Sequence, residues 1–413
     1  MRVLKTVQSY FPFQERGGTV FKVRAIARGL ARRGHHVTVL TADLGIRSRN
    51  SDRQFEPCSW GWRRNEEGVE IVYLSTVARY RALTVNPGAR RFCDSSLKSF
   101  DLVHIYGLYD LLGPAAASFC KRSAIPYILE PMGMYRPIVR NLALKKVYQQ
   151  MIGARLAERA RFVIATSELE REDLLAAGID PEKVVVRRNG IDVPDRLPER
   201  GGFRKSLDLP EIATVILFLG RIVSKKRPDL LIQAFADWQG RASNRQNSFL
   251  IVAGPKEADG YVRSLKSLAK SLGVSERVLF IGPIYGDQKW QAYRDADVFV
   301  LPSENENFGN TAAEAASCGT PVIVTDRCGI APLIERAGLI VPPERVAIAN
   351  AIEKILGDRA FNRRCRTGCT EVPGRLSWDQ PLDELEQVYQ LCCPANISHE
   401  QTLTSTQFRE HAT

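Results

Sequence analysis

Residues 304–321 read ENENFGNTAAEAASCGTP and interrupt an otherwise apolar part of the chain. The run DVFVLP (297–302) before them is typical of a buried strand, and TPVIVTD (320–326) after them is typical of another. A short Ala-rich helix is expected between the two strands, so NFGNT lies where a strand leads into a helix. Ligands bind at the carboxyl ends of strands in parallel sheets. The segment therefore predicts an α/β domain with a ligand site at this junction.

Alternating apolar runs and helical patterns fill the rest of the chain as well. In the first half the expected strands are 3–8, 36–41, 69–74, 101–106, 126–130, 161–166 and 183–188. In the second half they are 214–220, 248–254, 277–282, 297–302 and 320–326. The Pro-, Gly- and charge-rich segment 189–204 separates the two series and reads as a linker. Strands with intervening helices predict two parallel, doubly wound α/β sheets.

The boundaries follow from these patterns. We expect an N-terminal Rossmann-like domain over 1–195 and a C-terminal Rossmann-like domain over 196–375. A last helix, 376–393, is expected to return to the N-terminal domain, and 394–413 has the composition of a flexible tail.

Composition excludes several classes of protein. The chain has 413 residues, and no apolar run approaches the roughly 18 residues that span a bilayer. The first residues lack the apolar core of a secretory signal, so a cytoplasmic protein is expected. The nine cysteines are scattered without a CxxC pair or nearby histidines, so neither a zinc site nor any other metal site is expected.

The net charge of +12 is confined to one half of the chain. Residues 1–200 hold 33 Lys and Arg against 21 Asp and Glu, whereas residues 201–413 hold 25 against 25. The first half is therefore expected to face something anionic: a membrane surface, a phosphorylated substrate or nucleic acid. A solubilising surface is the alternative, and charge alone does not separate these.

A cluster of cations marks a second strand-to-helix junction. In GRIVSKKR (220–227), Arg221, Lys225, Lys226 and Arg227 crowd the loop after an expected strand. Four cations repel one another unless they share an anion, and a diphosphate fits because Arg can bind two oxygens while Lys acts as a point charge. A solvated basic loop is the alternative.

Backbone amides and carboxylates complete the predicted ligand site. The N–H groups of Asn307–Thr311 suit a phosphate or a sugar oxygen, and Gly309 allows close approach. Glu306 and Glu314 flank that site and would accept hydrogen bonds from hydroxyls on either side. A molecule with hydroxyls, a diphosphate and more hydroxyls is a nucleotide sugar. Either glutamate alone could instead be a capping or surface residue.

In the first half, Gly17 and Gly18 follow the first strand and precede a helical pattern over 19–34. Two glycines there would let the backbone approach a ligand at the helix N-terminus. A plain tight turn is the alternative. Neither half contains GxGxxG, which argues against a nicotinamide enzyme.

Together these motifs resemble family-4 glycosyltransferases of the GT-B fold, in which two Rossmann-like domains face each other across a cleft. The matching pieces are the GG pair (17–18), RRNGID (187–192), GRxxxxK (220–226), E-x7-E (306–314), TDRCGIAPLI (325–334) and the helix beginning at Trp378. The resemblance implies a retaining transferase that uses a nucleotide-diphosphate sugar and needs neither cofactor nor metal.

By this resemblance Arg221, Lys226 and Glu306 are the catalytic residues. Arg221 and Lys226 would bind the diphosphate and stabilise the departing nucleotide, and Glu306 would hold sugar hydroxyls. Glu314 would bind the ribose, and Gly18 with its neighbour would approach the diphosphate or the acceptor. The implied donor site consists of Gly17, Gly18, Arg221, Lys226, Glu306, Asn307, Phe308, Gly309, Asn310, Thr311 and Glu314.

One segment departs from the family pattern. Many relatives carry a histidine-glycine pair after the strand equivalent to 126–130, but here PMGMYRP follows, with Met132 at the usual histidine position. Met132 cannot accept a proton from a sugar. His104 and Glu130 are possible substitutes near the sugar or acceptor, together with Met132 and Gly133. A histidine that ends a buried strand is, however, more often structural.

The acceptor is left open. Segment 136–162 is basic and carries apolar residues at Leu142, Leu144, Val147, Met151, Ile152 and Leu156. It fits either an anionic bilayer or a core-facing helix with a basic outer side. With the charge excess in this half, we expect peripheral contact with the inner face of a membrane and a glycan or lipid-linked acceptor.

Three classes of function compete. The first is a retaining hexosyltransferase in surface polysaccharide or glycolipid synthesis. The second is a GT-B enzyme that hydrolyses or epimerises a nucleotide sugar, for which no acid and base pair is convincingly placed. The third is a nucleic-acid-binding protein, for which the sequence offers no recognised module. We favour the first; uridine and guanosine diphosphate donors both stay open.

Overall fold

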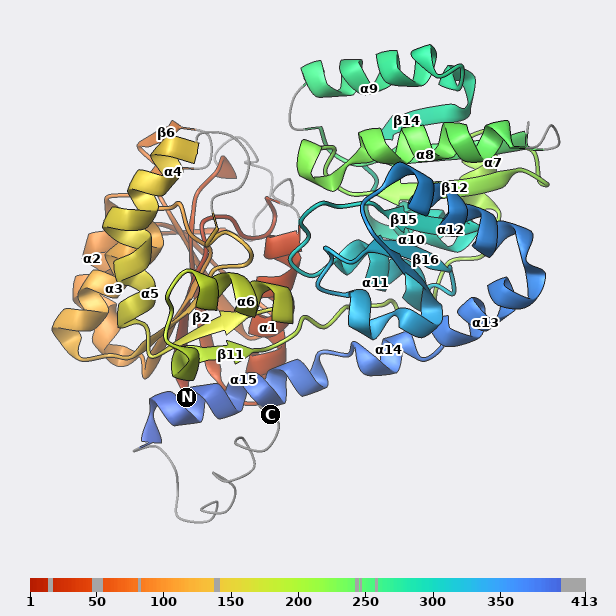
Figure 1. The fold of residues 1–413 in the computed structure, drawn as a ribbon. Helices are drawn as coiled ribbons and strands as arrows, with labels where there is room; N and C mark the ends of the chain where they lie inside the picture. The colour runs from red at the N-terminus through yellow and green to blue at the C-terminus, as the bar shows by residue number, and fades with distance from the viewer. Residues whose placement is uncertain are drawn as a thin grey trace.

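The computed structural model describes residues 1–13, 18–46, 55–80, 83–136, 142–241, 245, 247–256 and 259–394. These residues form two α/β domains that lie side by side, each built on its own sheet (Figure 1). The predicted class, two Rossmann-like domains, is confirmed. Of the predicted tail, all but Pro394 lies outside the described residues.

The N-terminal sheet has nine strands in the order β11-β10-β9-β8-β1-β2-β5-β4-β3. They are β1 (Arg2–Thr6), β2 (His36–Ala42), β3 (Glu56–Cys58), β4 (Gly61–Glu66), β5 (Val69–Leu74), β8 (Leu102–Tyr106), β9 (Tyr127–Glu130), β10 (Phe162–Ala165) and β11 (Val184–Val186). Seven of them pair in parallel, and these are the seven apolar runs expected from the sequence.

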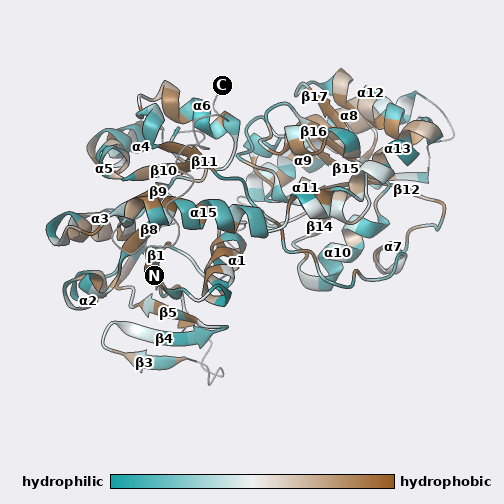
Figure 2. Ribbon diagram, turned by 90° about the horizontal axis from the view of Figure 1, so that it is seen from below, coloured by the Kyte–Doolittle hydropathy of each residue, from teal (hydrophilic) through white to brown (hydrophobic). Residues whose placement is uncertain are grey.

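The expected parallel sheet of the N-terminal domain carries an antiparallel hairpin at one edge. Strands β4 and β3 pair antiparallel beyond β5, and Figure 2 shows them at the end of the sheet. Strand β4 reads GWRRNE, with no apolar run, because its side chains are only half-buried or exposed. A separate two-stranded ribbon joins β6 (Ala78–Tyr80) and β7 (Leu83–Val85).

The C-terminal sheet has six parallel strands in the order β14-β13-β12-β15-β16-β17. They are β12 (Thr214–Leu219), β13 (Ser248–Ala253), β14 (Val278–Gly282), β15 (Val298–Leu301), β16 (Val322–Thr325) and β17 (Gly338–Val341). Strand β17 was not among the expected strands: its sequence GLIV is short, and its last three residues are only partly buried.

Helices cover both faces of each sheet. In the N-terminal domain they are α1 (Gly18–Arg32), α2 (Gly88–Ser96), α3 (Leu112–Ser123), α4 (Leu142–Tyr148), α5 (Ala154–Arg159) and α6 (Glu168–Ala176). In the C-terminal domain they are α7 (Gly202–Ser206), α8 (Pro228–Gly240), α9 (Asp259–Ser271), α10 (Gly286–Asp295), α11 (Asn310–Ser317), α12 (Arg345–Gly357), α13 (Arg359–Cys369) and α14 (Val372–Arg375). No helix in the described ranges combines the length and the apolar character that a bilayer crossing needs.

The last helix, α15 (Asp379–Cys392), leaves the C-terminal domain and lies along the N-terminal one (Figure 1). Leu382, Leu385 and Val388 are buried in the same apolar cluster as Val3 and Ile26 of the N-terminal core. The chain thus crosses twice between domains. The two crossings meet where the Ile191 N–H donates to the Leu376 carbonyl at 2.8 Å.

Candidate active site

The structure brings Lys226 and Glu306 together. Lys226 ends a short turn, Ser224–Lys226, in the loop after β12, and Glu306 precedes α11. The Lys226 Nζ lies 2.8 Å from Glu306 Oε2, and the two side chains are only 12% and 17% exposed. Because neighbouring parallel strands end at one edge of the sheet, β12 and β15 deliver these residues to one place.

Charge is unbalanced at this place. Burial raises the pKa of Glu306, but attraction to Lys226 and then Lys225 outweighs it, so the pKa lies below its usual value. Burial lowers the pKa of Lys225, and repulsion from Arg221 and Lys226 adds to that shift. Arg221 is exposed, and none of the described residues forms an ion pair with it. One carboxylate thus faces three cations, which favours an anionic ligand.

The N-terminus of α11 lies beside this pair. Gly309 precedes the helix with φ +111°, a left-handed conformation that glycine adopts without strain, and no side chain caps the helix. Thr311 Oγ1 is buried and has no hydrogen-bond partner among the described residues. Free N–H groups at a helix start and a positive dipole end bind phosphate or sugar oxygens.

Glu314 is held from one side and open on the other. Its Oε1 accepts from Lys289 Nζ at 2.9 Å and its Oε2 from the Tyr293 hydroxyl at 2.8 Å. Burial, followed by the Glu314 charge, raises the pKa of Tyr293 well above its usual value, so the hydroxyl stays a donor. The carboxylate is 18% exposed. The sequence did not single out Lys289 or Tyr293, because both lie on α10, away from any motif.

The N-terminal domain approaches the same helix. A side-chain carbon added to Gly18 would lie 3.4 Å from Asn310 Nδ2, and Asn189 Nδ2 donates to Asn310 Oδ1 at 3.3 Å. Gly17 lies outside the described residues. The Phe308 side chain is buried, so only its main chain is available at the site. The Phe308 carbonyl accepts from the Ile330 N–H at 2.6 Å.

Two residues predicted near the sugar are instead inside the N-terminal domain. Glu130 and His104 are both fully buried. The Glu130 oxygens accept from Arg187 Nη2 at 2.8 and 2.9 Å, pair with Lys22, and lie 3.4 Å from His104 Nε2. Neither side chain reaches the cleft surface, because Lys22 of α1 and Arg187 after β11 pack on Glu130, and Tyr389 of α15 packs on His104.

These groups belong to a buried network that the sequence did not predict. Burial raises the pKa of Glu130, but Arg187 and then Lys22 outweigh it and keep the pKa well below its usual value. Burial lowers the pKa of Lys22 to about 8. Tyr389 of α15 joins the network, since its hydroxyl accepts from Lys5 Nζ at 2.9 Å and lies 2.8 Å from His104 Nδ1. The residues come from five strands and helices and from the loop after β11, so no local pattern connects them.

The buried imidazole predicts a pH dependence of folding stability. Burial, followed by repulsion from Lys5, lowers the pKa of His104 from 6.5 to about 3. Between these values the unfolded chain binds a proton that the folded protein does not, so this residue lowers the free energy of unfolding as pH falls. The expected slope is about 1.4 kcal/mol per pH unit.

A variant isolates this effect from other groups. Burial raises the pKa of Asp110 to about 6. Over part of this range Asp110 therefore increases the free energy of unfolding as pH falls, opposite to His104. Urea unfolding of the wild type and of His104→Gln between pH 4.5 and 6.5 should therefore be compared. The wild type should lose stability relative to the variant as pH falls; parallel curves would contradict the assignment.

Gly133, in contrast, contacts the other domain, whereas Met132 beside it is partly buried against the N-terminal core. Both have positive φ, 56° and 72°, and form a tight turn after β9. A side-chain carbon on Gly133 would lie 2.9 Å from Asn307 Cβ, which is too close for any other residue. The turn therefore touches the loop that carries Glu306. Within the described part of the chain, no cluster of three or more His, Cys, Asp or Glu residues could hold a metal ion.

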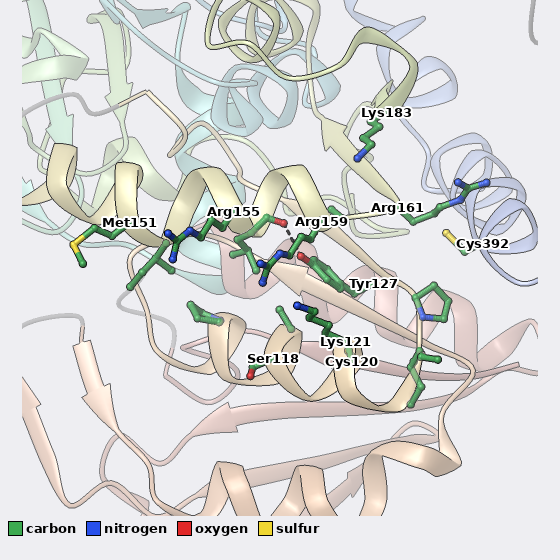
Figure 3. A pocket seen from close by; sticks show the side chains of 18 residues that line it. Ser118, Cys120, Lys121, Tyr127, Met151, Arg155, Arg159, Arg161, Lys183 and Cys392 are labelled. Carbon is green, nitrogen blue, oxygen red and sulfur yellow. Dashed lines mark hydrogen bonds between the residues drawn. The ribbon is translucent and has the colours of Figure 1, made fainter.

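A groove of about 800 Å³ lies away from this site, between α3 and α5. Figure 3 shows Arg155 and Arg159 on one wall and Lys121 on the facing helix. Arg161 and Lys183 add two more cations, and no carboxylate is among the described residues that line the groove. Its apolar lining includes Ile125, Tyr127, Met151, Ile152 and Leu156.

Two Rossmann-like domains that meet at a cationic site beside an uncapped helix fit the GT-B architecture, and comparisons with known proteins identify the class as glycosyltransferase. The family model described as "Glycosyl transferases group 1" matches residues 200–370, and that of the "Glycosyl transferase 4-like domain" matches residues 17–190. A D-inositol 3-phosphate glycosyltransferase from Stackebrandtia nassauensis is 32% identical over 310 residues, 70% of this chain and 68% of the relative. The chain belongs to glycosyltransferase family 4.

Solved structures agree on the fold. Sucrose-phosphate synthase from Thermosynechococcus elongatus superposes with a TM-score of 0.75 at 22% identity, over 95% of this chain and 99% of that one. HepE from Anabaena, solved in complex with UDP and glucose, superposes with a TM-score of 0.72 at 18% identity over the same shares.

Proposed function

We propose that this glycosyltransferase moves a hexose from a nucleotide-diphosphate sugar to a glycan or lipid-linked acceptor, with retention at the anomeric carbon, in surface polysaccharide or glycolipid synthesis. The observation that carries the proposal is the Lys226–Glu306 pair beside the uncapped start of α11. The family relatives and the UDP and glucose in a structural neighbour support the donor class.

The cationic and the anionic side chains have different proposed roles. Arg221 and Lys226 neutralise the diphosphate as the bond to the sugar breaks, and the α11 amides add donors that cost no reorganisation. Glu306, ionised beside Lys226, accepts from sugar hydroxyls, and Glu314 accepts from the ribose. Because these cations supply the positive charge that the leaving group needs, we propose that transfer requires no metal ion, and that a chelator leaves the rate unchanged.

A panel of nucleotide sugars tests the proposal. A ligand that binds only the native state raises the melting temperature by mass action, so the correct donor should give the largest shift. Sugar release from that donor should then depend on an added glycan or lipid-linked acceptor. Release at full rate without an acceptor would instead indicate a hydrolase, and conversion of the sugar within the nucleotide would indicate an epimerase.

We further propose that the N-terminal domain contacts the inner face of an anionic membrane. Val147 and Met151, on successive turns of the helix before the groove, are 50% and 63% exposed. Arg155 and Arg159 follow four and eight residues after Met151. The exposed apolar side chains are therefore followed along the helix by two cationic side chains. Leu156 is buried and faces the core, and the side chains of Leu142 and Leu144 lie outside the described residues.

Charge reversal at Arg155 and Arg159 should weaken membrane binding. Each cation near an anionic surface contributes roughly 1 kcal/mol, so Arg155→Glu with Arg159→Glu should reduce sedimentation with phosphatidylglycerol vesicles by about tenfold or more. The matched control is Arg359→Glu with Arg363→Glu, two exposed positions on α13. Equal binding of the wild type to phosphatidylcholine vesicles, or equal loss in both double variants, would contradict the proposal.

A further inference from the structure

Glu170 joins three separate parts of the cleft wall, although it lies in none of the motifs. It sits in the first turn of α6 and is 4% exposed. Its Oε1 accepts from the Gly133 N–H at 2.5 Å, in the turn after β9. Its Oε2 accepts from both the main-chain N–H and the hydroxyl of Thr166, at 2.8 and 2.9 Å. All three hydrogen bonds that the carboxylate accepts therefore come from the segments that follow β9 and β10.

Local helix capping does not account for these contacts. Ser167 caps α6 and accepts from the Glu170 N–H at 3.2 Å, the first half of a capping box. In a full capping box the glutamate would turn back to the main-chain N–H of Ser167. Here it reaches past Ser167 to Thr166 and across to Gly133. A carboxylate placed only for the helix would not need a partner 37 residues away.

Both partners of Glu170 touch the same residue of the other domain. Asn307 Nδ2 donates to the Thr166 hydroxyl, and Gly133 lies against the Asn307 side chain. The hydroxyl proton of Thr166 points to Glu170, which leaves the hydroxyl lone pairs to accept from Asn307. Glu170 thereby sets the polarity of this contact as well as its position.

The contact extends to a second loop that binds Glu306. Asn307 follows Glu306 in the chain, and the Gly329 N–H donates to the Glu306 carbonyl at 3.0 Å. A side-chain carbon added to Gly329 would lie 2.5 Å from the Ser167 Cβ, so α6 presses on that loop too. The start of α6 therefore meets both Asn307 and the loop at Gly329 that binds the main chain of Glu306.

We infer that Glu170 is a positioning residue that builds the docking platform for Asn307 and so fixes the closed arrangement of the two domains. This rests on the proposed function, because closure matters here through Glu306 and Lys226. Glu170 touches neither of those side chains and acts only through Gly133, Thr166 and Asn307. Donor affinity resides in the C-terminal domain, so loss of Glu170 should slow turnover more than it weakens donor binding.

Glu170→Gln is the sharpest probe, since an amide has the same shape but cannot accept from both partners at once. With the nucleotide sugar that stabilises the wild type most, kcat should fall about 10- to 100-fold, the size expected from a small misplacement of reacting groups. The dissociation constant of the matching nucleoside diphosphate should change by less than about threefold. Glu172→Gln, an exposed position on the same helix, is the control and should leave both values unchanged.

Two further measurements keep the inference testable. Thr166→Val removes only the hydroxyl that accepts from Asn307, and it carries the test should Glu170→Gln fail to fold. A double-mutant cycle with Asn307→Ala should show strong coupling to Glu170→Gln, because both changes break one contact. Small-angle scattering with saturating nucleoside diphosphate should give a larger radius of gyration for Glu170→Gln and Thr166→Val than for the wild type.

The outcomes separate the two proposals. Wild-type kcat in folded Glu170→Gln and Thr166→Val overturns the inference and leaves the proposed function standing. A loss of nucleotide affinity equal to the loss of kcat also overturns it. A wild type that transfers no sugar from any donor defeats the proposed function. Scattering then still tests the role of Glu170 in domain closure: an unchanged radius of gyration in both variants overturns that role, and a larger radius supports it.

Discussion

Lys226→Ala is expected to reduce sugar transfer at saturating donor by about 10²- to 10³-fold, the effect of removing one group that stabilises developing charge. The lysine amine is the cation that contacts Glu306 and faces the predicted diphosphate. Without it the leaving group departs with less neutralisation, and Glu306 loses the partner that holds it in place. Turnover and thermal unfolding measured on the same preparation check this result.

Controls distinguish this effect from general damage. Lys256→Ala removes a lysine of the same domain whose side chain is 63% exposed and whose partner is Asp259, so it should leave turnover unchanged. Glu306→Ala should remove transfer as well, because the sugar then lacks its acceptor of hydrogen bonds. A folded Lys226→Ala enzyme that retains wild-type turnover would refute the assignment of the donor site.

The second large effect concerns stability. Glu130→Gln should lower the free energy of unfolding by about 3–5 kcal/mol, the usual result of removing one partner from a buried ion pair. Arg187 and Lys22, both buried, would then face an amide in place of a carboxylate. Denaturant unfolding monitored by circular dichroism measures the difference.

A surface glutamate provides the comparison. Glu56, on β3, pairs with Arg63, and its side chain is 66% exposed, so Glu56→Gln should change the free energy of unfolding by less than about 1 kcal/mol. Equal stability of the wild type and Glu130→Gln would show that the Glu130 network contributes little. The network also holds the start of one interdomain crossing, at Arg187, and the helix of the other, through Tyr389.

Much of the fold was predictable because its signals are local. The apolar runs that become β1, β2 and β12 bury four or more successive residues, so each run predicts a strand from its own sequence. The hairpin β3–β4 and the short strand β17 were not predicted. Their residues are only partly buried, and pairing with neighbouring strands holds them in the sheet. The antiparallel edge depends on what lies next to it in space.

The contact between Lys226 and Glu306 was predictable for a similar reason. Lys226 and Glu306 each stand at the end of a strand, and strands of one parallel sheet end together. Glu130 also ends a strand and His104 lies in the middle of one, yet the structure buries both. Whether a strand end is open or covered depends on helices far away in the sequence, here α1 and α15.

The sequence by itself determined the two sheets and the chemistry offered at their edges, since strand periodicity, loop glycines and clustered charges act over a few residues. Only the tertiary structure decided which carboxylates lie partly exposed in the cleft and which are buried against cations. It also placed Glu170 behind Gly133, Thr166 and Asn307, residues 37, 4 and 137 positions away. Such contacts follow from how distant segments pack, and burial is a property of the whole assembly and not of any one stretch of chain.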